Sequence, residues 1–151
     1  MSALVNIPKM TLLALDVTSH QSIKAAVASV QAELDPGVGL DLLVNNAGVA
    51  SSTPALDHKV EDTRAMFEAN LFGMMSMVQE FMPLLMLSSD ACIVNVGSNA
   101  AYIPLAFGSS YNASKAAVHA YSDTLRVGEC LIFLFASLLT GICRALPSQV
   151  R

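Results

Sequence analysis

Three short runs of almost wholly apolar residues constrain the fold of this chain most. They are TLLALDV (Thr11 to Val17), LDLLVNNAG (Leu40 to Gly48) and ACIVNVGS (Ala91 to Ser98). Runs of this length and composition are typical of strands buried on both sides. Segments with helical spacing separate them, and buried strands that alternate with helices predict a parallel sheet covered by helices on both faces. We therefore expect an α/β fold with a Rossmann-like, doubly wound parallel sheet.

Three helices are expected between and after these strands. Ser19 is a suitable N-cap for a first helix along SIKAAVASVQAEL, which the turn DPGVG ends. A long helical stretch is expected from about Lys59 to Leu87. Ser109 is a suitable N-cap for a third helix that begins SSYNASK and runs to Val127.

Polar residues end each expected strand. Asp16 ends the first run, Asn45 and Asn46 end the second, and Gly97 and Ser98 end the third. Parallel strands bring their carboxyl ends to the same edge of a sheet, and ligands bind outside that edge. We expect these polar ends to gather there.

Composition excludes several classes of function. A formal net charge of -4 and a pI of about 5.1, without a basic patch, make nucleic acid a poor partner. The three cysteines lack paired spacing, which indicates reduced thiols in an intracellular protein. The three histidines have no metal-ligand spacing, so no metal site is expected and they are read as surface or packing residues: His20, His58 and His119.

Tyr111 and Lys115 are four residues apart at the head of the third helix and so share one helix face. A cation beside a phenol favours the ionised form, which suits the phenol to acid–base chemistry. The hydroxyl of Ser98, at a strand end, can converge with this phenol on one carbonyl oxygen. Asn70 lies among apolar residues of the long helix, where its amide needs a partner.

The combined pattern resembles the short-chain dehydrogenase/reductase family. The motifs are NNAG at Asn45 to Gly48, Asn70 followed by Gly73, Ser98, and YNASK at Tyr111 to Lys115, in the family's order and spacing. LDVT at Leu15 to Thr18 also resembles that family's third strand. The resemblance covers about Leu12 to Val127.

The resemblance implies hydride transfer between a nicotinamide cofactor and a carbonyl or alcohol. Tyr111 would be the proton donor, and Lys115 would stabilise its ionised form and hold the nicotinamide ribose. Ser98 would polarise the carbonyl, and Asn70 would hold its helix open around a water that relays protons. The implied cofactor contacts are Asp16, Val17, Asn45, Ala47, Gly48, Tyr111 and Lys115.

Several phrases resemble a fungal subgroup, the NADPH-dependent 1-acyldihydroxyacetone-phosphate reductases. They are VNVGS, FMPLL and YNASKAAVHAYSDTLRV. This implies NADPH as the cofactor, with NADH left open, and a lipid-like carbonyl or alcohol substrate. It also implies the cytoplasm, or the surface of the endoplasmic reticulum or lipid droplets. Membrane association and a homo-oligomer remain open.

The chain also departs from the family pattern. It lacks the TGxxxGxG turn that holds the cofactor's pyrophosphate, and strands equivalent to 3, 4 and 5 are expected without the first two and last two. We expect a domain truncated at both ends over residues 1–127, followed by a divergent apolar tail over residues 128–151. The run Leu131 to Cys143 is shorter than a bilayer span and is read as a buried segment. Weakened cofactor binding is expected, and an inactive fragment that acts as an oligomerisation or interaction module stays an alternative.

Overall fold

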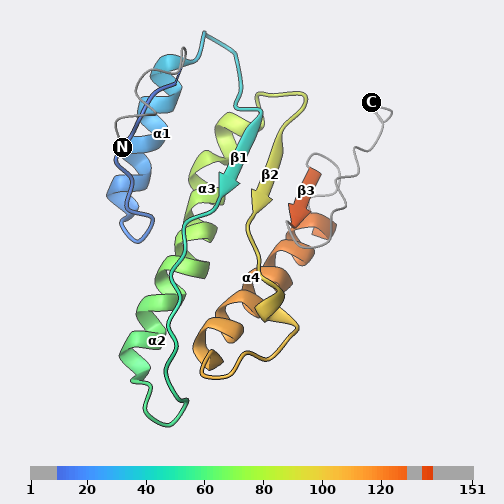
Figure 1. The fold of residues 1–151 in the computed structure, drawn as a ribbon. Coiled ribbons are helices and arrows are strands. Elements are labelled where there is room, and N and C mark those ends of the chain that lie inside the picture. Colours follow the sequence, from blue (N-terminus) through green and yellow to red (C-terminus); the bar gives the residue numbers. More distant parts are fainter. Residues whose placement is uncertain (1–9, 129–133, 138–151) are drawn as a thin grey trace.

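The computed structural model describes residues 10–128 and 134–137 (Figure 1). Along the chain, helix α1 (His20–Glu33) precedes strand β1 (Leu42–Asn45), and the helical segments α2 (Val60–Phe67), η1 (Glu68–Phe72) and α3 (Gly73–Leu85) follow without a break. Strand β2 (Cys92–Asn95), the 3-10 turn η2 (Asn99–Ala101), helix α4 (Ser109–Gly128) and strand β3 (Leu134–Ser137) complete the fold.

The three strands form a parallel sheet in the order β1-β2-β3. In this register Leu43 lies beside Ile93, and Ile93 lies beside Phe135. Helices connect the parallel strands, so the predicted α/β class with a Rossmann-like parallel sheet is confirmed.

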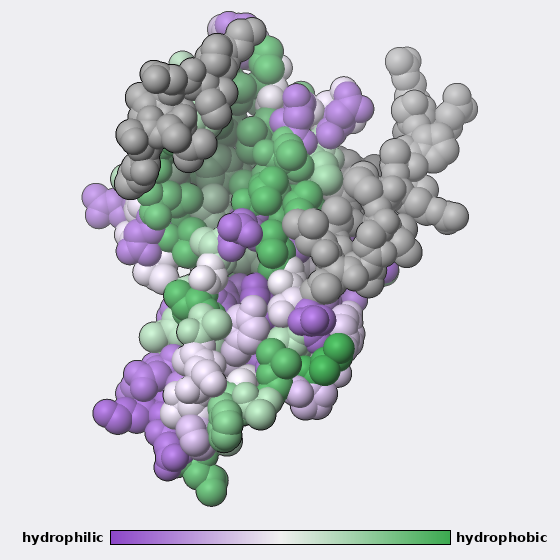
Figure 2. All heavy atoms as spheres, in the orientation of Figure 1, coloured by the Kyte–Doolittle hydropathy of each residue, from purple (hydrophilic) through white to green (hydrophobic). Residues whose placement is uncertain are grey.

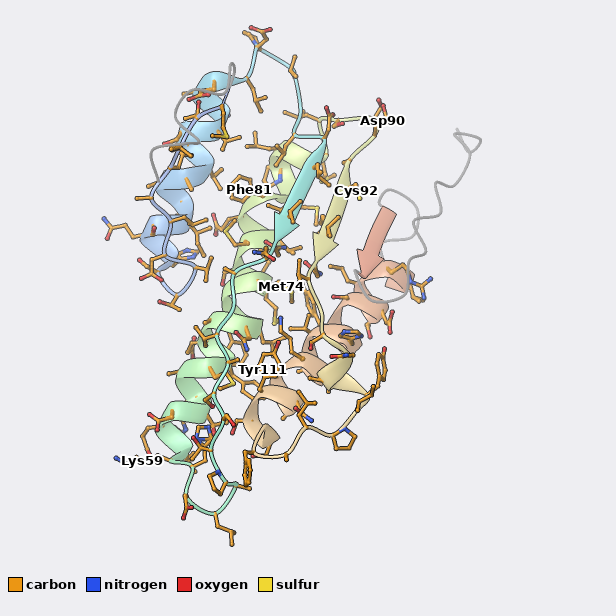
Figure 3. All side chains as sticks on the ribbon, in the orientation of Figure 1. Lys59, Met74, Phe81, Asp90, Cys92 and Tyr111 are labelled. Carbon is orange, nitrogen blue, oxygen red and sulfur yellow. The ribbon has the colours of Figure 1, made fainter. Side chains whose placement is uncertain are left out.

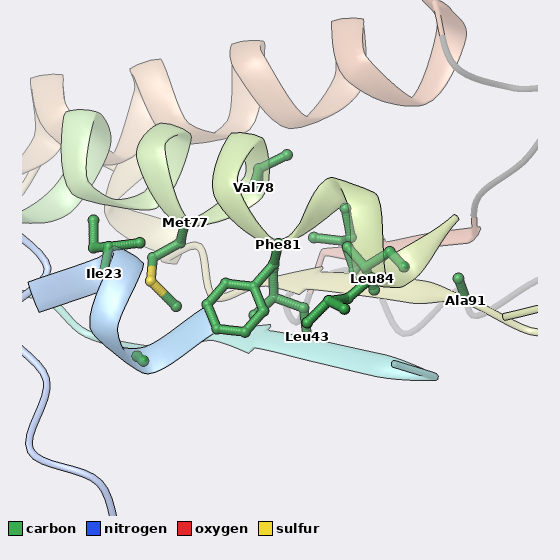
Figure 4. Packing of buried hydrophobic residues seen from close by; sticks show 10 residues of the cluster. Ile23, Leu43, Met77, Val78, Phe81, Leu84 and Ala91 are labelled. Atoms are coloured by element: carbon green, nitrogen blue, oxygen red, sulfur yellow. The ribbon is translucent and has the colours of Figure 1, made fainter. Parts of the chain in front are cut away.

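One face of this sheet packs on α3. Side chains alternate between the faces of a strand, so Leu43 and Ile93 are buried on the helix side. They contact a core cluster that includes Phe81 and Met77 of α3 and Ile23 of α1 (Figure 4). Burying a side chain of this size stabilises the fold by about 1.5–3 kcal/mol relative to leaving it exposed.

The second face of the sheet differs from the prediction. Leu42 and Val44 of β1 point away from α3 and are 52% and 50% exposed. Figure 2 shows apolar residues gathered over this face. The expected cover of helices on both faces is therefore not found among residues 10–128 and 134–137.

The expected first strand is also wrong. Thr11 to Asp16 form no strand and are exposed, and Thr11 donates from Oγ1 to Glu33 Oε2 of α1 at 2.7 Å. In the described sheet β1 pairs with β2 alone, and its other edge is not paired with this segment. A strand without a partner leaves its backbone groups unpaired, and the segment instead runs along α1.

The third strand was not expected. β3 pairs with β2 in parallel, with Cys92 beside Leu134 and Asn95 beside Ser137. β3 lies inside residues 128–151, the range predicted as a divergent tail. One strand is therefore present after the strand expected as the equivalent of the family's fifth, where none was expected. The remainder of the apolar run from residue 131 to 143 falls outside the described residues.

The predicted helices are confirmed with small shifts. Ser19 caps α1, since its hydroxyl accepts from the Ser22 N–H at 3.3 Å. The predicted long helix spans residues 60–85 but contains the π-helical turn η1. Ser109 is the first residue of α4 rather than its N-cap, and the Gly108 carbonyl accepts from the Asn112 N–H at 2.7 Å.

Candidate active site

The candidate site lies where β1 and β2 end. Both strands point toward the half of the molecule that holds η1 and the first turns of α4 (Figure 1). The chain segments that follow each strand run past these helical turns, and Tyr111 lies in the first turn of α4 (Figure 3). Four elements from separate parts of the sequence therefore supply the site.

Asn70 fastens two of these elements together. It is 2% exposed and lies in the π-helical turn η1, in which the Gly73 N–H donates to the Glu68 carbonyl. Its Oδ1 accepts from the Val49 N–H at 2.7 Å, while Nδ2 donates to the Val49 carbonyl at 2.9 Å and to Ser114 Oγ at 3.0 Å. The amide thus joins the segment after β1 to helix α4, and its burial is fully compensated.

Lys115 links α4 to the end of β2. Its Nζ donates to the Val96 carbonyl at 2.9 Å and lies 6.0 Å from the centroid of the Tyr111 ring. Among the described residues Val96 offers Nζ its one acceptor, which leaves two of the three ammonium donors available for a ligand. The side chain is buried, and burial lowers the pKa of the Lys115 ammonium because the charged form loses hydration.

Gly48 leaves the space beside this ammonium open. A Cβ at this position would lie 3.7 Å from Lys115 Nζ and 3.1 Å from Asn70 Oδ1. A side chain there would press on the Asn70 amide and occupy space next to the lysine. Glycine lets the backbone approach both groups.

Ser98 lies in the segment that follows β2, but its hydroxyl bonds within the loop that Ser98 begins. Its Oγ accepts from the Ala100 N–H at 3.2 Å and caps η2, and its backbone N–H donates to His119 Nε2 at 3.2 Å. In the described part of the chain no hydrogen bond joins Ser98 Oγ to Tyr111 or Lys115. The tyrosine and lysine are thus brought together, and Ser98 is tied to the same helix through His119.

Asn45 points across the sheet. Its Nδ2 donates to Asn95 Oδ1 at 2.9 Å, Asn95 Nδ2 donates to Ser122 Oγ at 3.0 Å, and Ser122 donates to the Val118 carbonyl at 2.7 Å. This chain of bonds crosses β1, β2 and α4. It fixes the ends of both strands relative to the helix that carries Tyr111.

Asp16 and Val17 lie apart from this cluster. The Asp16 carboxylate accepts from Thr18 Oγ1 at 2.7 Å and from Thr18 N at 2.9 Å, which lowers the pKa of Asp16, since these bonds favour the charged form. The Val17 carbonyl lies 2.7 Å from where a Cβ on Gly73 would stand, so this backbone runs against the start of α3. Within the described residues, no hydrogen bond connects Asp16, Val17 or the exposed Ala47 to α4. Asp16 therefore does not end a strand as expected.

Sequence reasoning missed four residues that organise the site: Asn95, Ser114, His119 and Ser122. Ser114, His119 and Ser122 share a helix with Tyr111, and each is buried. One signal was available for His119. It follows Lys115 by four residues, so the two share a helix face.

Two kinds of feature are absent from the described residues, 10–128 and 134–137. No group of three or more histidine, cysteine or acidic side chains there is arranged to hold a metal ion. None of the helices in this part of the chain combines the length and apolar character that crossing a bilayer requires.

Comparisons with known proteins assign this chain to a family. The family model described as short chain dehydrogenase matches residues 2–129. The chain is 44% identical over 113 residues to the short-chain dehydrogenase virD of Hypocrea virens, covering 75% of this chain and 38% of that protein. It is 40% identical over 115 residues to the NADPH-dependent 1-acyldihydroxyacetone phosphate reductase of Schizosaccharomyces pombe, covering 76% and 38%.

Solved structures agree in fold. NADPH-bound carbonyl reductase from chicken fatty liver superposes with a TM-score of 0.80 at 29% identity, over 86% of this chain and 57% of that one. Serine dehydrogenase from Escherichia coli gives a TM-score of 0.66 at 34% identity, over 76% and 51%. The chain spans less than half the length of the two curated relatives named above. Its matched family model and shared fold show that the chain belongs to the short-chain dehydrogenase family.

Proposed function

We propose that this chain carries the catalytic half of an NADPH-dependent oxidoreductase that reduces a carbonyl to an alcohol, with Tyr111 as the proton donor. One observation carries the proposal. The Lys115 ammonium is buried beside the Tyr111 ring and donates one hydrogen bond to the Val96 carbonyl. Among the described residues its other two N–H groups have no acceptor and can bind a ligand.

The residues present fit the nicotinamide-ribose end of such a cofactor. Two spare N–H donors on Lys115 suit the adjacent hydroxyls of a ribose, and Gly48 keeps the neighbouring space clear. When bound, the cofactor supplies a hydride to the carbonyl carbon. NADPH is proposed over NADH because the relatives and structures that name a phosphorylated cofactor include the Schizosaccharomyces pombe reductase and the chicken enzyme.

The chain's own groups handle the proton and the developing charge. The Tyr111 O–H transfers its proton to the carbonyl oxygen as that oxygen becomes negative. Lys115 stabilises the phenolate that remains, since opposite charges attract strongly where water is excluded. Ser98 donates a hydrogen bond to the same oxygen.

Asn70 is assigned a structural role in its helix. The π-helical turn in which it lies shifts the helix to i,i+5 bonding, and such turns often occur at functional sites. We assign it the role of keeping this helix open for a water that relays protons to Lys115. Asn45, Ala47 and Gly48 are assigned to the cofactor's nicotinamide side, and Asp16 and Val17 to its adenine side.

The substrate class follows from the subgroup resemblance. We assign a lipid-like carbonyl of the 1-acyldihydroxyacetone-phosphate type, which the similarity to the Schizosaccharomyces pombe reductase supports. A homo-oligomer, and a location in the cytoplasm or at the endoplasmic reticulum or lipid droplet surface, belong to the same proposal.

The test is NADPH oxidation by the purified 151-residue chain with a 1-acyldihydroxyacetone phosphate as substrate. Tyr111→Phe is expected to lower kcat by at least about 100-fold, the usual contribution of a general acid. Lys115→Met is expected to raise the Kd for NADPH, measured by nicotinamide fluorescence. Turnover equal to that of the unmodified chain in Tyr111→Phe would refute the assigned proton donor.

Two matched controls separate chemistry from folding. Tyr121→Phe removes a phenol from the same helix, and Lys24→Met removes an exposed ammonium from α1. Both are expected to retain turnover and NADPH affinity. If neither the unmodified chain nor the controls bind NADPH saturably, the interaction-module alternative replaces the enzyme proposal.

A further inference from the structure

His119 occupies a buried position directly behind the Ser98 peptide. The residue is 6% exposed, on the same face of α4 as Lys115. A Cβ added to Gly97 would stand 2.1 Å from its Nε2, so the imidazole fits only against a residue without a side chain. The ring therefore packs on the backbone that leads from β2 into Ser98.

Both ring nitrogens have defined partners. The Ser98 N–H donates to Nε2 at 3.2 Å, and Nδ1 lies 2.9 Å from the Tyr102 hydroxyl oxygen. A backbone N–H can only donate, so Nε2 must present its lone pair and carry no hydrogen. A neutral imidazole then holds its proton on Nδ1 and donates it to Tyr102.

The Tyr102 phenol completes the arrangement from the other side. It is 65% exposed as a residue, yet its ring meets the imidazole edge-on, with centroids 5.0 Å apart and planes at 88°. Its oxygen accepts from Nδ1, so its own O–H is left to donate outward. One imidazole thereby fixes two points of the loop, at positions 98 and 102.

We propose that His119, as the neutral Nδ1–H tautomer, is a positioning residue that holds Ser98 in place through its backbone N–H. This inference rests on the proposed function, in which the Ser98 hydroxyl donates to the substrate oxygen. Without the bond to Nε2, the Ser98 N–H loses its hydrogen bond to α4, the helix that carries Tyr111 and Lys115. His119 touches no substrate in this scheme and acts only through Ser98.

The tautomer is measured directly by long-range proton–nitrogen NMR on the full chain with nitrogen-15 histidine at neutral pH. Free histidine favours the Nε2–H form, whereas in a protein the hydrogen bonds decide the tautomer. We expect His119 to show a protonated Nδ1 and an unprotonated Nε2. An Nε2–H tautomer or a doubly protonated ring would overturn the proposal, whatever the chain's activity.

Two variants test the consequence for Ser98. His119→Leu removes the acceptor, and His119→Gln keeps an amide oxygen that can reach the same N–H. Hydrogen exchange at the Ser98 amide is expected to be about tenfold faster in the leucine variant, the effect of losing one neutral hydrogen bond. The glutamine variant is expected to restore most of the protection. Equal exchange in all three proteins would contradict the proposal, and if the leucine variant does not fold, the tautomer decides.

Turnover separates this inference from the proposed function. If Tyr111→Phe abolishes turnover, we expect His119→Leu to lower kcat with partial recovery in His119→Gln. An unchanged kcat in His119→Leu would then refute the positioning role. If Tyr111→Phe leaves turnover unchanged, the proposed function fails, while the tautomer and Ser98 exchange still decide how His119 acts on Ser98.

Discussion

Asn70 binds the backbone of Val49 with both ends of its side-chain amide. Oδ1 accepts from the Val49 N–H at 2.7 Å, and Nδ2 donates to the Val49 carbonyl at 2.9 Å. Two bonds between one side chain and one residue fix both distance and orientation. The segment that follows β1 is therefore locked to the π-helical turn, and through Ser114 to α4.

Replacing Asn70 with alanine should destabilise the fold strongly. The change removes the side-chain partner of the part-buried Val49 N–H and carbonyl and of the buried Ser114 hydroxyl, and we expect a loss of about 1–3 kcal/mol in the free energy of unfolding. Urea denaturation followed by circular dichroism measures this loss. Asn46→Ala, at an exposed asparagine, is the matched control and should change stability by less than about 0.5 kcal/mol. A similar midpoint for both variants would contradict the assigned clamp.

Gly97 and His119 should be strongly coupled in a double-mutant cycle. Gly97→Ala places a methyl group 2.1 Å from Nε2, and the backbone or the ring must shift. We expect this variant to lose roughly 1–3 kcal/mol of stability, as overpacked sites do. Combined with His119→Ala, the added cost of Gly97→Ala should nearly vanish. Additive effects would show that the ring and the glycine do not share the space.

Gly37 supplies the control for that cycle. It has a φ of 81°, and nothing lies within 4 Å of a Cβ built on it. Gly37→Ala should therefore cost about 1 kcal/mol through backbone strain alone. Its effect should be the same with or without the His119→Ala change.

His119 should make the fold less stable in mild acid. Burial lowers its pKa from 6.5, with a further decrease from Lys115 and an opposing increase from Asp123. As the pH falls below 6.5, the unfolded chain binds a proton at this residue that the folded chain resists, so the free energy of unfolding decreases. The loss continues until the pH reaches the folded-state pKa.

The measurement is the urea midpoint between neutral pH and about pH 5, the range in which histidines titrate. His119→Gln should flatten the curve in this window. Parallel curves for His119→Gln and the unmodified chain would contradict the expected burial of a neutral imidazole.

Lys115 should produce a second window in which stability rises with pH, this time in alkaline solution. Burial lowers its pKa from 10.5, so between the folded-state pKa and 10.5 the unfolded chain holds a proton that the folded chain releases. The free energy of unfolding contributed by this group therefore rises with pH through that window. Lys115→Met should remove this rise, whereas Lys24→Met, at an exposed position, should retain it. Unfolding in urea at successive alkaline pH values measures the difference.

Local patterns predicted most of the described helices and two of the strands. The helical spacing after Ser19, in residues 60–85 and after Ser109 gave α1, the long helical segment and α4 within a few residues. The runs around Leu43 and Ile93 gave β1 and β2, because a buried strand leaves a continuous apolar signal. The pairing of Tyr111 with Lys115 followed from helical spacing alone.

Features that depend on distant partners escaped prediction. Thr11 to Val17 has the composition of a strand, but a strand also needs a neighbouring strand to pair with, and the composition of a segment does not reveal whether one lies beside it. The π-helical turn around Asn70 changes hydrogen-bond register without changing the apolar pattern. The sequence pattern predicts a role for Ser98 through its hydroxyl. In the structure Ser98 is held by a hydrogen bond from its backbone N–H to His119, a residue that the sequence indicated only as a surface or packing residue.

The contact between Gly97 and the His119 ring limits which residues can occur together at positions 97 and 119. A substitution at position 97 that adds even one carbon is compatible with the present backbone only after the imidazole has been exchanged for something smaller. In related chains the two positions should therefore change as a pair, histidine occurring with glycine and bulkier residues at 97 occurring with compact ones at 119.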